Sequence, residues 1–68
     1  MKVFKIGDSV TYYPEYGEPE KGVVKSLCDD PNYVFVVYNC NGEWHRYKDY
    51  TGCRTCVADL KSEWHENL

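Results

Sequence analysis

The sequence has little positive charge and no long hydrophobic run. Its eight lysines and arginines are outnumbered by 11 aspartates and glutamates, which gives a net charge of −3 and disfavours binding to nucleic-acid phosphates. No stretch approaches the roughly 20 apolar residues of a membrane helix, and residues 1–5 lack the apolar segment of a secretory signal. We therefore expect a cytoplasmic protein without membrane contact, in which the cysteines are reduced.

The chain is too short for more than one domain. Its 68 residues are assigned to a single domain, 1–68, with a frayed C-terminal end. A domain of this size buries only about 60% of the surface that the unfolded chain exposes. Large core side chains reduce that deficit, and 16% of the residues are aromatic. We therefore predict an aromatic core.

Short runs of β-branched and aromatic residues, separated by turn residues, predict strands. The expected strands are 9–13, 22–27, 33–39, 44–50 and a last one near 61–64. Asn41-Gly42 favours a tight turn within a hairpin over 33–50. Two prolines and a glycine in residues 14–20 predict a long acidic loop, and residues 55–60 suit one 3-10 turn. The predicted fold class is all-β, a small five-stranded SH3-like barrel with a short 3-10 turn before the last strand.

Alternation along the strands predicts which side chains face the core. In the first strand, Val10 and Tyr12 share a face and are the expected core pair. In residues 44–50 the two faces differ in charge, because one carries both cations. The face expected to be exposed to solvent carries Trp44, Arg46, Lys48 and Tyr50. Tyr47 falls on the opposite, core-facing side.

Several short motifs resemble those of known small barrels. Gly7-Asp8-x-Val10, Gly22-x-Val24, V-F-V-V-Y at 34–38 and Ala58-Asp59-Leu60 resemble barrel domains of the KOW and Tudor type. Residues 34–64 are more closely similar to a group of uncharacterised small proteins of phages and bacterial mobile elements. The matching positions are 34–38, Cys40, Trp44, Arg46, Tyr47, Tyr50, Thr51, Arg54, Thr55, Asp59 and Leu60. The resemblance implies a barrel and a mobile-element origin and brings no activity; where that group has Ala-Ala before Arg-Thr, this chain has Gly52-Cys53.

The four cysteines do not have the spacing of a typical zinc site. Cys53-x-x-Cys56 is one closely spaced pair, and Cys28 and Cys40 would have to complete a four-thiolate site. Those two flank a predicted strand that spans roughly 20 Å, so they would not converge. Structural zinc and C-x-x-C redox chemistry remain alternatives. We predict no bound metal, no cofactor and no disulfide, with the thiols serving as small apolar side chains.

The sequence offers no convincing catalytic group. Neither His45 nor His65 lies at a spacing typical of metal ligands or of a nucleophile–base pair. Asp29-Asp30 precedes Pro31 and is typical of a turn. A carboxylate pair for acid–base chemistry also needs a cleft, which so small a barrel rarely provides. We therefore predict that the protein is not an enzyme.

A binding surface is the remaining functional candidate. The assigned residues are Trp44, Arg46, Lys48, Tyr50, Arg54 and Tyr16. Aromatic planes beside guanidinium groups suit peptide anchoring or base stacking, although core packing and a merely solvated loop are the simpler explanations. We expect a non-enzymatic module that binds an unidentified protein through the aromatic-basic strand face and the acidic 14–20 loop. The alternative is a nucleic-acid or nucleotide binder that uses the 44–54 surface; if both surfaces are used, copies would associate head to tail as a homo-oligomer.

Overall fold

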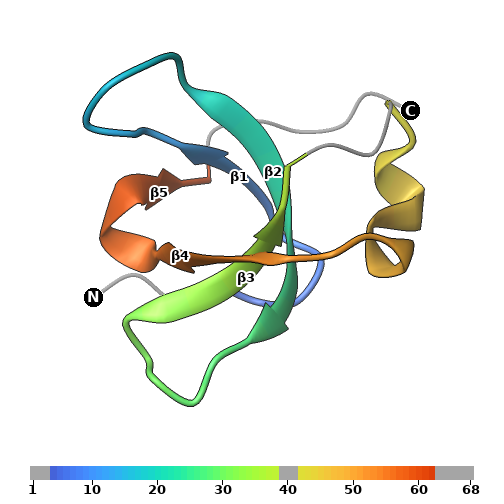
Figure 1. Cartoon of the computed structure of the whole chain (residues 1–68). Helices are drawn as coiled ribbons and strands as arrows, with labels where there is room; N and C mark the ends of the chain where they lie inside the picture. The colour runs from blue at the N-terminus through green and yellow to red at the C-terminus, as the bar shows by residue number, and fades with distance from the viewer. Residues whose placement is uncertain (1–3, 39–41, 63–68) are drawn as a thin grey trace.

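The computed structural model describes residues 4–38 and 42–62, which form one antiparallel sheet in the order β4-β3-β2-β1-β5 (Figure 1). The strands are β1 (Ser9–Tyr12), β2 (Glu20–Leu27), β3 (Tyr33–Val37), β4 (Cys53–Cys56) and β5 (Leu60–Lys61). The 3-10 helices are η1 (Trp44–Asp49) and η2 (Val57–Asp59). In this part of the chain both helices are too short to cross a lipid bilayer. The mostly-β class, the five antiparallel strands and the 3-10 turn before the last strand are confirmed.

β2 is the long central strand of the sheet. It pairs with β1 on one side and with β3 on the other, and β5 returns beside β1. Lys25 interrupts the β2–β3 register, because Val24 faces Val36 whereas Ser26 faces Phe35. Such a bulge bends its strand and increases the local twist, and β2 curves visibly across the molecule in Figure 1.

The inner face of the sheet carries the hydrophobic core. The buried cluster consists of Phe4, Val10, Val24, Val34, Val36 and Leu60. Val10 is buried as predicted, whereas Tyr12 packs against the cluster at its margin together with Tyr38. The prediction of an aromatic core is wrong for the described residues, in which Phe4 is the one aromatic side chain that is buried. Valine fills the inner face because β-branched side chains suit a tightly pleated surface.

The predicted strand over 44–50 is also wrong, and with it the hairpin over 33–50. Trp44–Asp49 is a 3-10 helix, and the strand beside β3 is β4. Gly42 does have the positive φ of +81° expected of a turn, whereas residues 39–41 lie outside the described residues. So do residues 63–68, which hold part of the expected last strand and His65; β5 is found at Leu60–Lys61.

The 3-10 helix η1 covers part of the outer face of the sheet. Val23 and Val37 face each other across β2 and β3 and are buried, yet they do not belong to the inner cluster. η1 packs against β2, and Figure 1 shows it on the opposite side of β2 from β5. The chain therefore buries apolar side chains on both faces of its central strands.

Candidate functional site

Side chains of η1 follow a period of three rather than the period of two expected of a strand. Residues three apart eclipse each other in a 3-10 helix, and η1 consists of two such turns joined by non-helical backbone at Arg46. Trp44, Tyr47 and Tyr50 are half-buried, which places the three aromatic residues toward the sheet. The spacing W-x-x-Y-x-x-Y at 44–50 is the sequence signal that would have indicated this arrangement. Trp44 and Tyr50 are therefore separated from Arg46 and Lys48, and the predicted stripe does not form.

The charges of η1 largely cancel one another. Arg46 lies one turn from both Glu43 and Asp49; its Nη1 is 3.6 Å from Glu43 Oε2, and its Nε donates a 3.2 Å hydrogen bond to Asp49 Oδ2. Lys48 Nζ lies 5.9 Å from the centre of the Tyr47 ring. Over residues 43–49, two carboxylates thus flank two cations and balance their charge. This surface has little net charge with which to attract an anion.

The end of η1 is tied to the bulge in β2. The Lys25 ammonium donates a hydrogen bond to the Tyr50 carbonyl oxygen, so the extra residue of the bulge directs its side chain toward η1. Gly52 follows at close range, since a Cβ there would lie 3.0 Å from Phe35 Cβ. The small residue at position 52 therefore lets the chain pass close over Phe35.

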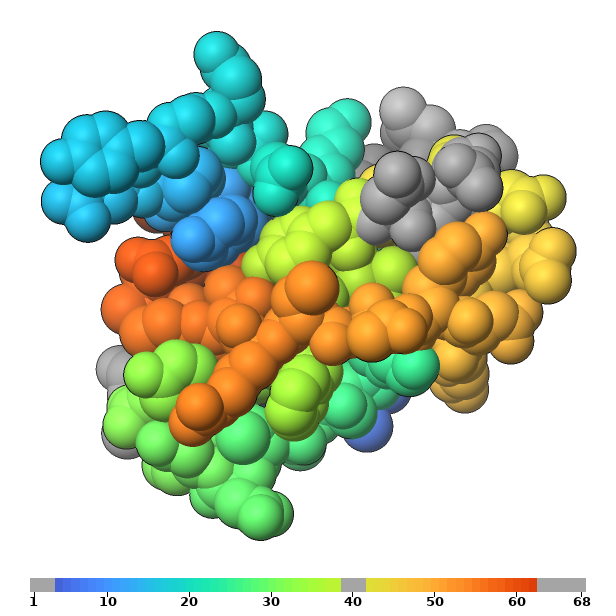
Figure 2. Space-filling model, in the orientation of Figure 1, coloured from blue at the N-terminus to red at the C-terminus, as the bar shows by residue number. Residues whose placement is uncertain are grey.

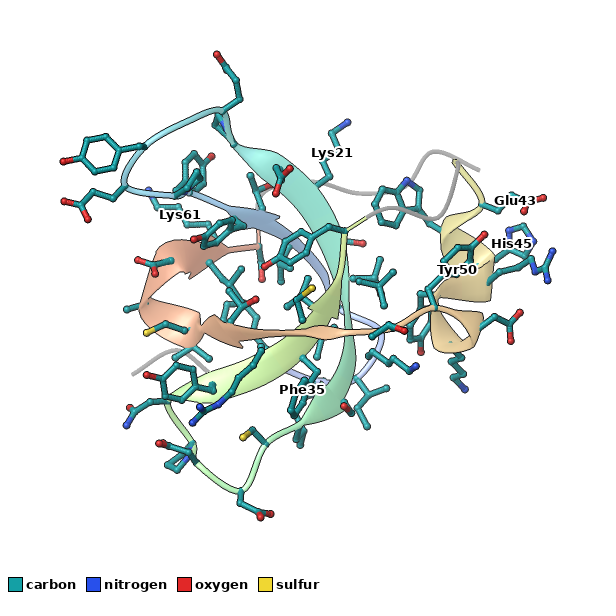
Figure 3. All side chains as sticks on the ribbon, in the orientation of Figure 1. Lys21, Phe35, Glu43, His45, Tyr50 and Lys61 are labelled. Atoms are coloured by element: carbon teal, nitrogen blue, oxygen red, sulfur yellow. The ribbon has the colours of Figure 1, made fainter. Side chains whose placement is uncertain are left out.

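The acidic loop, residues 14–20, projects from the other end of the sheet. The Tyr13 N–H donates to the Asp59 carbonyl oxygen at 2.8 Å, and Lys61 Nζ lies 5.3 Å from the Tyr13 ring centre. These contacts fix the base of the loop, near Lys61 in Figure 3. At its tip Gly17 has a φ of +103° and Tyr16 is 86% exposed. Tyr16 is thus far more exposed than any side chain of the core margin, and it does not join the η1 residues.

Carboxylates surround Tyr16. Glu15, Glu18 and Glu20 are all exposed, and within residues 4–38 and 42–62 none of the three forms an ion pair. Like charges at this spacing repel and keep the side chains apart and hydrated. The loop therefore presents an aromatic ring within a negative field.

Arg54 belongs to a different surface, on the outer face of β3 and β4. Residues directly opposite in an antiparallel pair share a face; Arg54 faces Phe35, and Tyr33 faces Cys56. The Arg54 guanidinium carbon lies 4.0 Å from the Tyr33 ring centre, which is stacking distance. We call Arg54, Tyr33 and Phe35 the Arg54 platform. Sequence reasoning missed Tyr33 and Phe35, because the register of β4 against β3 is a long-range property.

The Arg54 guanidinium is exposed, and among the described residues it makes no ion pair with a carboxylate. This is the reverse of Arg46, whose charge is matched by Glu43 and Asp49. Tyr33 stacks on the guanidinium and Arg54 is exposed, so the positive charge is accessible to another molecule. Of the assigned residues, Arg54 and Tyr16 are therefore the ones best placed to meet another molecule.

The described cysteines do not converge. Cys53 and Cys56 begin and end β4, so an odd spacing places them on opposite faces, about 10 Å apart along the strand. Cys28 follows β2 and is, like Cys53 and Cys56, a free thiol; Cys40 lies outside the described residues. In this part of the chain there is no group of three or more His, Cys, Asp or Glu that could hold a metal ion.

Burial strongly shifts the pKa of Tyr38. Its hydroxyl lies 2.6 Å from Thr55 Oγ1, which donates in turn to the Cys53 carbonyl oxygen at 3.1 Å. Burial raises the pKa of Tyr38 to about 12, and the hydrogen bond to Thr55 partly offsets that increase. The ring packs against Tyr12 at 5.7 Å between centroids. This arrangement closes the margin of the core.

No protein-family model matches the chain, and searches of curated proteins and of solved structures gave no significant match.

Proposed function

We propose that the protein is a non-enzymatic interaction module that binds a basic segment of another protein through its acidic loop. The observation that carries the proposal is Tyr16, which is 86% exposed at the tip of that loop. Tyrosine is enriched at interface hot spots because a large ring loses little conformational entropy when it is buried. The neighbouring Glu15 and Glu18 add the charge that selects a partner rich in lysine or arginine.

The proposal also includes the type of fold. We infer that the sheet is that of a small SH3-like barrel related to phage or mobile-element proteins. Support comes from the strand order, from β1 pairing with both β2 and β5, from the bulge in β2 and from the 3-10 helix η2 before β5. Small barrels use their loops for recognition, and that analogy concerns the fold alone.

A protein partner is favoured over nucleic acid because of the charge distribution. The net charge is −3, and on η1 the Arg46 guanidinium is already paired with Glu43 and Asp49. Phosphate binding needs several unpaired cations on one surface. The acidic loop would instead repel a phosphate backbone.

Selection from a random peptide library tests this proposal. We expect enriched peptides to carry lysine or arginine beside an apolar residue, and ¹⁵N-labelled protein to show shift changes in residues 13–20 when one such peptide is added. Tyr16→Ala should weaken binding at least about tenfold, the effect of a modest hot spot. Leu27→Ala is the matched control, because Leu27 is also apolar and 56% exposed but lies at the far end of β2.

Two results would overturn the proposal. One is equal binding of the selected peptides to the wild type and to Tyr16→Ala. The other is a failure to enrich basic peptides while single-stranded DNA produces shift changes at η1 or β4, which would favour the nucleic-acid alternative.

A further inference from the structure

The chain carries two exposed surfaces whose chemistry is complementary. The acidic loop presents the Tyr16 ring between Glu15 and Glu18, and the Arg54 platform presents a guanidinium stacked on Tyr33. A carboxylate accepts hydrogen bonds from a guanidinium in a charge-assisted pair, and a second aromatic ring fits the open face of a stacked arginine. Each surface therefore offers what the other lacks.

The acidic loop lies too far from the Arg54 platform of its own chain to contact it. The acidic loop leads into the start of β2, whereas the turn at 28–32 leads from the end of β2 to Tyr33. The eight residues of β2 would separate these ends by about 23 Å if the strand were straight. Figure 2 shows the segment around residues 13–20 projecting at one end of the molecule and the segment around 28–33 at the other. Figure 3 likewise shows Phe35 toward the 28–32 turn and Lys61 toward the acidic loop.

We propose that the protein associates with itself head to tail, the acidic loop of one copy docking on the Arg54 platform of a second copy. The choice of a second copy as the partner rests on charge. Within residues 4–38 and 42–62, Arg54 is an exposed cation without an ion pair, and Glu15, Glu18 and Glu20 of the loop likewise form none. Arg46 does not compete with Arg54 for the acidic loop, because Glu43 and Asp49 already neutralise its charge. Since the two surfaces differ, the contact is heterologous and extends into chains or rings.

The contact is expected to be weak and sensitive to salt. One loop on one platform buries less than the roughly 1,200 Å² of a stable complex, so we expect a dissociation constant of about 0.1 to 1 mM. Screening by salt shortens the range of exposed charges to about 8 Å at physiological ionic strength. This association uses the loop of the proposed function but does not depend on a foreign partner.

A dilution series of ¹⁵N-labelled protein tests the inference. We expect concentration-dependent shifts at both 13–20 and 33–35 with 54, and a loss of these shifts in added salt. Arg54→Gln should abolish them. Arg46→Gln is the matched control, because it changes the net charge equally at an arginine that is already paired, and it should leave the shifts in place.

A charge exchange makes the test decisive. Glu15→Lys/Glu18→Lys reverses the loop, and Arg54→Glu reverses the platform, so each variant alone should be monomeric. An equimolar mixture should associate, because the reversed loop of the first fits the reversed platform of the second. The inference is overturned if no shift depends on concentration up to about 1 mM, if the shifts lie elsewhere, or if Arg46→Gln removes them equally. Since Arg54→Gln leaves the acidic loop intact, binding of basic peptides should persist in that variant, which separates this test from that of the proposed function.

Discussion

Replacing Gly22 by alanine should destabilise the domain, because β2 and β3 pack too closely there for a methyl group. A Cβ at Gly22 would lie 2.5 Å from Val36 Cγ1 and 3.1 Å from the Val37 carbonyl oxygen, whereas carbon atoms normally approach to about 3.5 to 4.0 Å. Overpacking of this kind costs about 1 to 3 kcal/mol. Alanine also restricts the unfolded chain, which stabilises by about 0.4 to 1 kcal/mol. We therefore expect a net loss of up to about 2.6 kcal/mol of unfolding free energy in a urea titration.

A double-mutant cycle identifies the cause of that loss. Val36→Ala removes Cγ1 and should itself cost about 1.5 to 3 kcal/mol, the value of a buried valine side chain. If the clash is responsible, Gly22→Ala/Val36→Ala should be more stable than the sum of the single effects by about 1 kcal/mol. Gly42→Ala is the control, since a Cβ there meets no atom within 4 Å but the φ of +81° is strained, so Val36→Ala should not rescue it. Additive effects in the cycle, or a stabilised Gly22→Ala variant, would refute the close approach.

Three further predictions concern ionisation, surface charge and the thiols. Burial raises the pKa of Tyr38 from 10.0 to about 12, so its contribution to stability is present below pH 10 and is lost as the pH rises toward 12; Tyr38→Phe should reduce that part of the decline in alkaline denaturation curves. Replacing Arg46 and Lys48 together by alanine should change the unfolding free energy by no more than about 1 kcal/mol, because exposed ion pairs contribute little; an early thermal transition would contradict this. Protein purified without chelator should hold no stoichiometric zinc by elemental analysis, because Cys53 and Cys56 lie on opposite faces of β4; one zinc per chain would show that the cysteines do converge.

The strands were predictable where alternation and turn residues agreed. Val10 on β1 and the apolar run of β3 identify buried positions from sequence alone, since only a packed strand suits so many β-branched residues. Residues 44–50 were wrongly predicted to form a strand, because their side chains also fit a period of two. The residues that share one face in that period are Trp44, Arg46, Lys48 and Tyr50. The aromatic residues at 44, 47 and 50 instead follow a period of three, and this segment forms the 3-10 helix η1.

The candidate site was less predictable than the fold. Arg54 and Tyr16 were assigned from residue type, but Tyr33 was not, because its contact with Arg54 depends on the pairing of β4 with β3. The neutralisation of Arg46 was visible as Glu43 and Asp49 at a spacing of three, a spacing that matters only once the segment is recognised as helical. The pairing register of β4 with β3 and the helical structure of residues 44–49 could therefore not be predicted from the sequence.

η1 covers part of the outer face of β2, the central strand of the sheet. Val24 and Val36 belong to the inner cluster, while their neighbours Val23 and Val37 are buried on the outer face. Backbone amides enclosed on both sides exchange their hydrogens only in the rarest openings of a protein, whereas short segments at the periphery open more often. Deuterium should therefore enter η1 and the acidic loop first and the centre of β2 last. We expect that release of η1 from β2, through loss of the hydrogen bond between Lys25 and the Tyr50 carbonyl oxygen, exposes part of the outer face of β2 without unfolding the inner cluster. Such a local opening would be separate from global unfolding.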